Sequence, residues 1–301
     1  MIKFLKFCLI LFVVFALSIL LTPSIARILH PYFKFEKIFE RLVMIGMVQA
    51  AFLFVILPKM RKGGKKALAD PELWRDYGFD FNAPWRKLLM YGFLAGAATV
   101  ASMAVVEVIF GPSSVRHPLS IQDIVERFFK GLLSGSLIGI IEEFFFRGFI
   151  FLTLSRKLNV WISVVITSTF YALSHFFDNG RIFIPQNPTT HDALRLLFGY
   201  LEPIAHQPFA ILPQFTGLLL FGILLNLAFI RTRSLFLSIG VHAGVVFAIK
   251  SQYSFVRQTF EGYHPFFGGK PYYDAPVEWL FLIFLGGMIW LSTQNFLESQ
   301  N

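Results

Sequence analysis

Long runs of apolar residues constrain the fold of this chain more than any other feature of its sequence. A run of roughly 18 or more apolar residues is long enough to cross the hydrocarbon core of a membrane as one helix. The chain of 301 residues contains about eight such runs. They lie near residues 5–23, 41–58, 88–110, 131–154, 158–177, 209–230, 234–250 and 276–293. The sequence therefore predicts an all-α polytopic membrane protein with about eight transmembrane helices.

Composition agrees with this interpretation and excludes some partners. Hydrophobic residues make up 55% of the chain and charged residues only 15%, against about 25% charged in a typical soluble domain. The net charge is +9, but the basic residues gather at the ends of the apolar runs, as in residues 58–66. Lys and Arg in such places set topology and meet anionic lipids, so we expect lipid headgroups and no nucleic acid as partners.

The order of the runs suggests three regions and an orientation. We expect N-terminal transmembrane helices and a basic loop in residues 1–120, a core region in 121–255 and a C-terminal helix in 256–301. The first run is long for the core of a signal peptide, so we interpret it as a retained anchor. Lys and Arg divide almost evenly between the two sides, and the dense cluster at 59–66 favours both termini inside. The expected location is a cell membrane, with a bacterial inner membrane as the simplest case.

Three ionisable residues interrupt the fourth run. Glu142, Glu143 and Arg147 are the only charged residues between Leu132 and Leu154. A charge at the centre of a bilayer costs roughly 2.5–3.5 kcal/mol on insertion scales, so such side chains face the bundle interior and find partners. Glu143 and Arg147 are four residues apart and share a helix face, which predicts an ion pair. That pair leaves Glu142 to face a different group.

Later runs supply candidate partners for Glu142. His175 lies in the fifth run with Tyr171 one turn before it, Asn226 in the sixth and His242 in the seventh. Because buried polar groups need compensation, we expect Glu142, His175 and His242 to converge in one cavity.

A carboxylate and two imidazoles among apolar side chains are compatible with several functions. They can activate water for hydrolysis, bind a metal as a metal-dependent membrane hydrolase, or relay protons in a carrier. A non-catalytic binding or immunity protein is a further alternative, in which the charges only fix helix packing. The zincin spacing His-Glu-x-x-His is absent, as is a pair of broken helices typical of transporters.

The motifs resemble those of the type II CAAX prenyl endopeptidase and bacteriocin-processing family (Abi or CPBP), which are intramembrane glutamic proteases. The family's Glu-Glu-x-x-x-Arg is matched by Glu142, Glu143 and Arg147. Its Phe-x-x-x-His is matched by Tyr171 and His175, with Tyr in place of Phe. The resemblance covers residues from about 125 to 250, and it implies a bundle of transmembrane helices.

The family's third motif, His-x-x-x-Asn, is present only in its first half. His242 matches the histidine, but Val246 stands where the family has Asn. Because Val cannot donate a hydrogen bond, this departure leaves three alternatives. The oxyanion hole is incomplete, a donor comes from Asn226 or Ser174, or catalysis is lost.

Carried over to this chain, the resemblance implies a role for each polar residue. Glu142 is the general base that activates water, and His175 orients it or shares its proton. His242 stabilises the oxyanion, while Glu143 and Arg147 support the site. The chain would thus hydrolyse a peptide bond near the end of a lipidated or membrane-anchored peptide or protein, without a cofactor or metal.

Overall fold

The computed structural model describes residues 71–176, 208–259, 263–269 and 273–294, with scattered residues in 9–28 and 187–198. The chain divides into two compact units. The first comprises residues 1–73 and 175–211, and the second comprises 74–174 and 212–301. The predicted boundaries at residues 120 and 255 are not tested by this division and stay a prediction.

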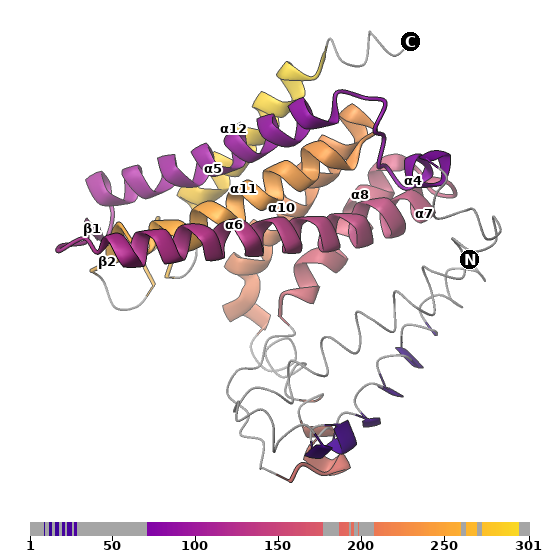
Figure 1. The fold of residues 1–301 in the computed structure, drawn as a ribbon, viewed down its shortest axis with the longest axis horizontal. Coiled ribbons are helices and arrows are strands. Elements are labelled where there is room, and N and C mark those ends of the chain that lie inside the picture. The colour runs from indigo at the N-terminus through magenta and orange to yellow at the C-terminus, as the bar shows by residue number, and fades with distance from the viewer. Residues whose placement is uncertain are drawn as a thin grey trace. The chain divides into compact units, whose positions relative to one another are not determined.

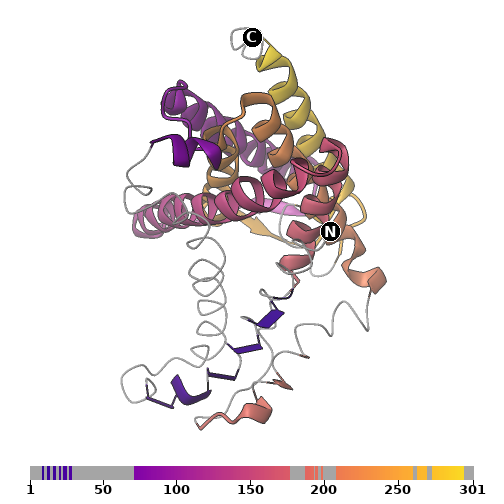
Figure 2. The same ribbon diagram turned by 90° about the vertical axis from the view of Figure 1, so that its right-hand side faces the viewer.

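Helices account for nearly all of the described structure, which confirms the all-α prediction. In order they are α4 (Pro71–Asp76), α5 (Trp85–Phe110), α6 (Ile121–Glu143), η3 (Phe144–Phe151), α7 (Leu152–Ser155), α8 (Val160–Ser174), α10 (Pro208–Thr232), α11 (Leu235–Gln252) and α12 (Pro276–Ser292). There are also two three-residue strands, β1 (Ser113–Val115) after α5 and β2 (Val256–Gln258) after α11. Seen from two directions, the helices of the second unit form a bundle (Figures 1 and 2).

The predicted runs correspond closely to these helices. Helices α5, α10 and α11 are each long and apolar enough to cross a membrane, and α8 and α12 are shorter apolar helices. The run at 41–58 lies outside the described residues, and the run at 5–23 is described only at scattered positions. The protein is thus an all-α membrane protein, and the count of eight spans stays a prediction.

Helix α6, which corresponds to the fourth predicted run, begins ten residues before the start of that run at residue 131. Ser120 caps α6 by accepting a hydrogen bond from the backbone N–H of Asp123. The polar first turns then gain ion pairs at i,i+4 spacing, Asp123 with Arg127 and Glu126 with Lys130. These local interactions keep a charged segment helical, whereas the prediction followed hydropathy alone.

Helix α11 is the central helix of the second unit, between α5 and α6 (Figure 1). About 72% of its apolar span is buried within the protein. Glycines make this close approach possible: a methyl group on Gly135 of α6 would lie 2.5 Å from the carbonyl oxygen of Ala243. A methyl on Gly92 of α5 would lie 2.5 Å from the Leu237 carbonyl oxygen. Small residues at helix crossings are typical of membrane bundles.

Both ends of the second unit are tied by backbone hydrogen bonds. Strands β1 and β2 pair antiparallel, so they join the C-terminal ends of α5 and α11. At the opposite end, the N–H of Leu235 donates to the carbonyl oxygen of Gly78. The loops after α5 and α11 therefore lie at one end of the bundle, and the segments before α5 and α11 lie at the other. Helices α5 and α11 therefore run in the same direction, as the alternating directions of successive transmembrane helices require.

Candidate active site

The polar residues predicted in the fourth and seventh runs meet inside the second unit. Glu142 and Glu143 end α6, and Arg147 follows in η3, which has π-helical hydrogen bonding. His242 lies in the second turn of the buried helix α11. A π-helical segment is uncommon and occurs frequently at functional sites.

Glu143 is the centre of this cluster. Its Oε1 accepts a hydrogen bond from Nη1 of Arg147 at 2.8 Å and lies 2.9 Å from Nδ1 of His242. The side chains of Glu143 and Arg147 are both fully buried. The predicted ion pair between them is confirmed. Because a carboxylate only accepts, the short contact with His242 requires a proton on Nδ1.

Further contacts hold the guanidinium group of Arg147. Its Nη2 donates to the carbonyl oxygen of Gly222 in α10 at 3.0 Å. Its Cζ lies 4.9 Å from the ring centroid of Tyr171 in α8, within the range of a cation–π interaction. Arg147 thus links η3 to α8 and α10 while it pairs with Glu143.

Glu142 occupies the more open side of the cluster. Its side chain is 31% exposed, and Oε2 lies 3.9 Å from Nε2 of His242. This distance is too long for a direct hydrogen bond and short enough for one water to contact both groups. The imidazole of His242 therefore lies between the two glutamates, held by Glu143 on one side and facing Glu142 on the other.

The structure does not place His175 relative to this cluster. His175 directly follows α8 and is half-buried, and it belongs to the first compact unit. Glu142 and His242 lie close together as expected, whereas the convergence of His175 with them stays a prediction.

Neither candidate replacement for the missing asparagine offers a free donor. Nδ2 of Asn226 donates to Oγ of Ser168 and to the carbonyl oxygen of Gly222, each at 3.0 Å. The hydroxyl of Ser174 donates to the carbonyl oxygen of Tyr171 at 2.7 Å. These donors are engaged in helix packing, so the geometry does not favour either as an oxyanion donor.

Sequence reasoning missed the glycines that bring Glu143 to His242. Gly131, Gly135 and Gly139 recur every four residues along α6, toward α11. A methyl group on Gly139, one turn before Glu143, would lie 3.1 Å from the carbonyl oxygen of Ile239. The small-xxx-small spacing in a predicted membrane helix was a readable signal for this crossing.

The cluster contains no arrangement of metal ligands. Within the described ranges, no group of three or more His, Cys, Asp or Glu is positioned to hold a metal ion.

Comparison with known proteins finds a family model that matches the part of the chain holding the site. Residues 124–248 match the family model described as Type II CAAX prenyl endopeptidase Rce1-like. The match confirms the resemblance, and its range contains all five predicted site residues: Glu142, Glu143, Arg147, His175 and His242. No curated protein and no solved structure matches the chain.

Proposed function

We propose that this chain, whose residues 124–248 match a family of CAAX-type membrane proteases, is an intramembrane glutamic endopeptidase. It hydrolyses a peptide bond near the end of a lipidated or membrane-anchored substrate. The observation that carries the proposal is the position of His242, with Nδ1 2.9 Å from Glu143 and Nε2 3.9 Å from the partly exposed Glu142. A water and a substrate carbonyl group can be held between Glu142 and Nε2 of His242.

In the proposed resting site, both ring nitrogens of His242 carry protons. Glu142 and Glu143 with Arg147 alone would leave one net negative charge in a largely desolvated cluster. A buried net charge is costly unless it is paired. Protonation of His242 makes the cluster neutral, and Nε2–H then becomes a donor directed toward Glu142.

The reaction then follows from these positions. Glu142 takes a proton from a water, and the resulting hydroxide attacks the carbonyl carbon of the scissile bond. The Nε2–H of His242 donates to the oxyanion as negative charge develops on the carbonyl oxygen. Glu142 returns its proton to the leaving nitrogen as the C–N bond breaks, and the carboxylate is regenerated. A preorganised donor of this kind contributes about 3–4 kcal/mol to transition-state stabilisation.

Three further residues complete the proposal. Glu143 and Arg147 are positioning residues, which hold the imidazole ring and fix its Nδ1 proton. His175 is assigned the role that the resemblance implies, in which it orients Glu142 or shares its proton.

Two measurements on the full-length protein test this function. Mass spectrometry of membrane peptides, with and without the protein, identifies substrates as peptides whose ends shift. Purified protein in detergent is then assayed on such a substrate and on a prenylated CAAX peptide. We expect Glu142→Gln to abolish cleavage and Glu126→Gln, an exposed change on the same helix, to leave it intact. Cleavage that survives Glu142→Gln would refute the mechanism.

A further inference from the structure

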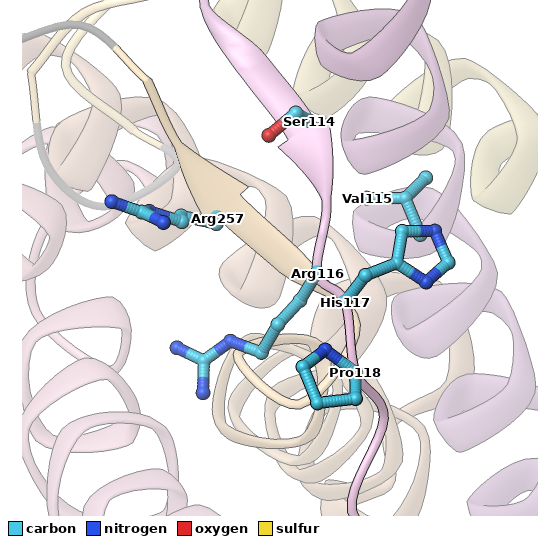
Figure 3. A pocket seen from close by; sticks show the side chains of 6 residues that line it. All are labelled: Ser114, Val115, Arg116, His117, Pro118 and Arg257. Carbon is cyan, nitrogen blue, oxygen red and sulfur yellow. The ribbon is translucent and has the colours of Figure 1, made fainter.

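A second polar feature lies at the end of α5 and α11 that carries the two strands. It is a cavity of about 460 Å³ beside β1 and β2, here named the strand pocket (Figure 3). Its lining consists of Ser114, Val115, Arg116, His117, Pro118 and Arg257. None of these residues belongs to the active-site cluster, which lies more than two helical turns away along α11.

Two arginines share one face of this two-stranded sheet. Ser114 pairs with Arg257 across the strands. Arg116 directly follows β1, two residues beyond Ser114, and its N–H still donates to the carbonyl oxygen of Phe255, so all three side chains lie on the same face. Figure 3 shows the side chains of Arg116 and Arg257 extending to one side, whereas Val115 and His117 extend to the other. The face therefore presents two guanidinium groups and one hydroxyl group.

The positive charge of the strand pocket is poorly neutralised. The guanidinium of Arg116 lies 3.9 Å from Asp123, whose carboxylate already pairs with Arg127 at 2.8 Å. For Arg257, no ion pair occurs with any residue that the structure describes. Among the described residues, Arg116 thus shares one carboxylate with Arg127 and Arg257 has none, so the lining of the pocket carries a net positive charge.

The surroundings place this pocket at a membrane boundary. Helices α5 and α11, both long enough to cross a membrane, end beside it. Apolar side chains next to it are widely exposed: Phe110 is 74% and Ile121 80% accessible. Exposed apolar residues beside basic ones are the pattern of a surface that contacts acyl chains and headgroups together.

We propose that the strand pocket binds the phosphate group of an anionic phospholipid. The planar fork of Arg matches phosphate oxygens through paired, charge-assisted hydrogen bonds, and Ser114 adds a hydroxyl donor. The neighbouring Phe110 and Ile121 contact the acyl chains of the same leaflet. A free phosphate shares the headgroup chemistry, but it gains nothing from these apolar contacts.

The test measures lipid binding to the purified full-length protein in a neutral detergent by native mass spectrometry. The probe is short-chain phosphatidylglycerol, compared with phosphatidylcholine of the same chain length and with inorganic phosphate. We expect phosphatidylglycerol to bind most tightly, and the double variant Arg116→Gln/Arg257→Gln to weaken its binding about tenfold or more, since hydrogen bonds to charged groups are lost. The matched control is Lys87→Gln/Lys130→Gln, which removes two exposed charges outside the pocket and is expected to bind like the parent.

A second variant, which keeps both arginines, tests the role of charge separately. Ser114→Asp adds a negative charge to the pocket and is expected to weaken phosphatidylglycerol binding by a similar factor. Binding by the arginine double variant equal to that of the control would overturn the proposal. Equal affinity for phosphatidylcholine would also overturn it, because the site would then not select an anionic lipid. Inorganic phosphate that binds as tightly as phosphatidylglycerol would overturn it as well, because the apolar contacts would then contribute nothing.

Discussion

At the residue scale, the site depends on Glu143, because one of its carboxylate oxygens binds both Arg147 and His242. The Glu143–Arg147 pair follows from i,i+4 spacing, which helix geometry fixes wherever the helix lies. The contact between Glu143 and His242 joins residues 99 apart in sequence, and it depends on how α6 crosses α11. Sequence reasoning therefore gave Glu143 one partner, whereas the same oxygen binds two.

Removal of Arg147 should destabilise the protein as well as inactivate it. Arg147→Ala leaves Glu143 buried without its cation, a change that costs roughly 3–5 kcal/mol for buried pairs. We expect a lower level of protein in membranes and little cleavage. The matched control is Arg127→Ala, which breaks an i,i+4 pair in a partly exposed setting and should cost about 1 kcal/mol or less. Normal accumulation and activity of Arg147→Ala would show that the pair is not structural.

Restoring the missing donor at Val246 should raise activity. Val246 lies one turn after His242 in α11 and is half-buried. Because Asn226 and Ser174 use their donors elsewhere, an amide at 246 adds a donor rather than duplicating one. We expect Val246→Asn to raise the cleavage rate by up to about tenfold, or 1.4 kcal/mol. The gain must disappear in the Val246→Asn/Glu142→Gln double variant; an unchanged or lower rate would contradict the prediction.

At the scale of elements, hydropathy located the helices but not their irregularities. The predicted runs from 88 to 293 each correspond to described helices. Hydropathy could not reveal that α6 starts at Ile121, because its first turns are held by a cap and ion pairs. It also could not reveal η3, because nothing in an apolar aromatic stretch distinguishes π-helical from α-helical hydrogen bonding.

Helix crossing through Gly135 should be essential for the site. A leucine side chain there would meet the backbone of Ala243 in α11, which cannot move aside without shifting the helix. We expect Gly135→Leu to lower stability by about 1–3 kcal/mol and to abolish cleavage, because α6 carries Glu142 and Glu143 away from His242. Gly286→Leu is the control, since no heavy atom lies within 4 Å of a methyl group at Gly286 of α12. Thermal unfolding and the cleavage assay compare the two, and equal behaviour would refute the role of the crossing.

At the scale of the whole molecule, the placement of His175 is the part of the site that neither the sequence nor the second unit fixes. His175 lies where the chain passes from one compact unit to the other. The distance from His175 to Glu142 depends on how the two units pack. Spacing within a helix carries no information on that packing.

Chelators should leave the proposed reaction unaffected. A histidine that ligates a metal must be free of its proton at the ligating nitrogen. In the proposed state, both nitrogens of His242 carry protons, and the cationic Arg147 lies close by. We therefore expect unchanged cleavage after treatment of the protein with EDTA. A loss of activity that zinc restores would instead support a metal-dependent hydrolase with Glu142, His175 and His242 as ligands.

The orientation of the bundle can be tested with two matched leucines. Leu119 precedes α6 and Leu158 follows α7, and both are exposed, at 46% and 41%. The helical path from Ile121 to Ser155 lies between them, so we expect them to lie on opposite sides of the membrane. With both termini inside, as the basic cluster at 59–66 favours, residue 119 is outside and residue 158 is inside.

Single cysteines at these positions report the orientation directly. In a Cys8→Ser background, which removes the one native cysteine, an impermeant thiol reagent applied to intact cells should label Leu119→Cys and not Leu158→Cys. After the cells are opened, both variants should react, which controls for accessibility. The reverse pattern in intact cells would show the opposite orientation, with the strand pocket on the cytoplasmic face. Labelling of both variants in intact cells would contradict a membrane crossing between α6 and α7.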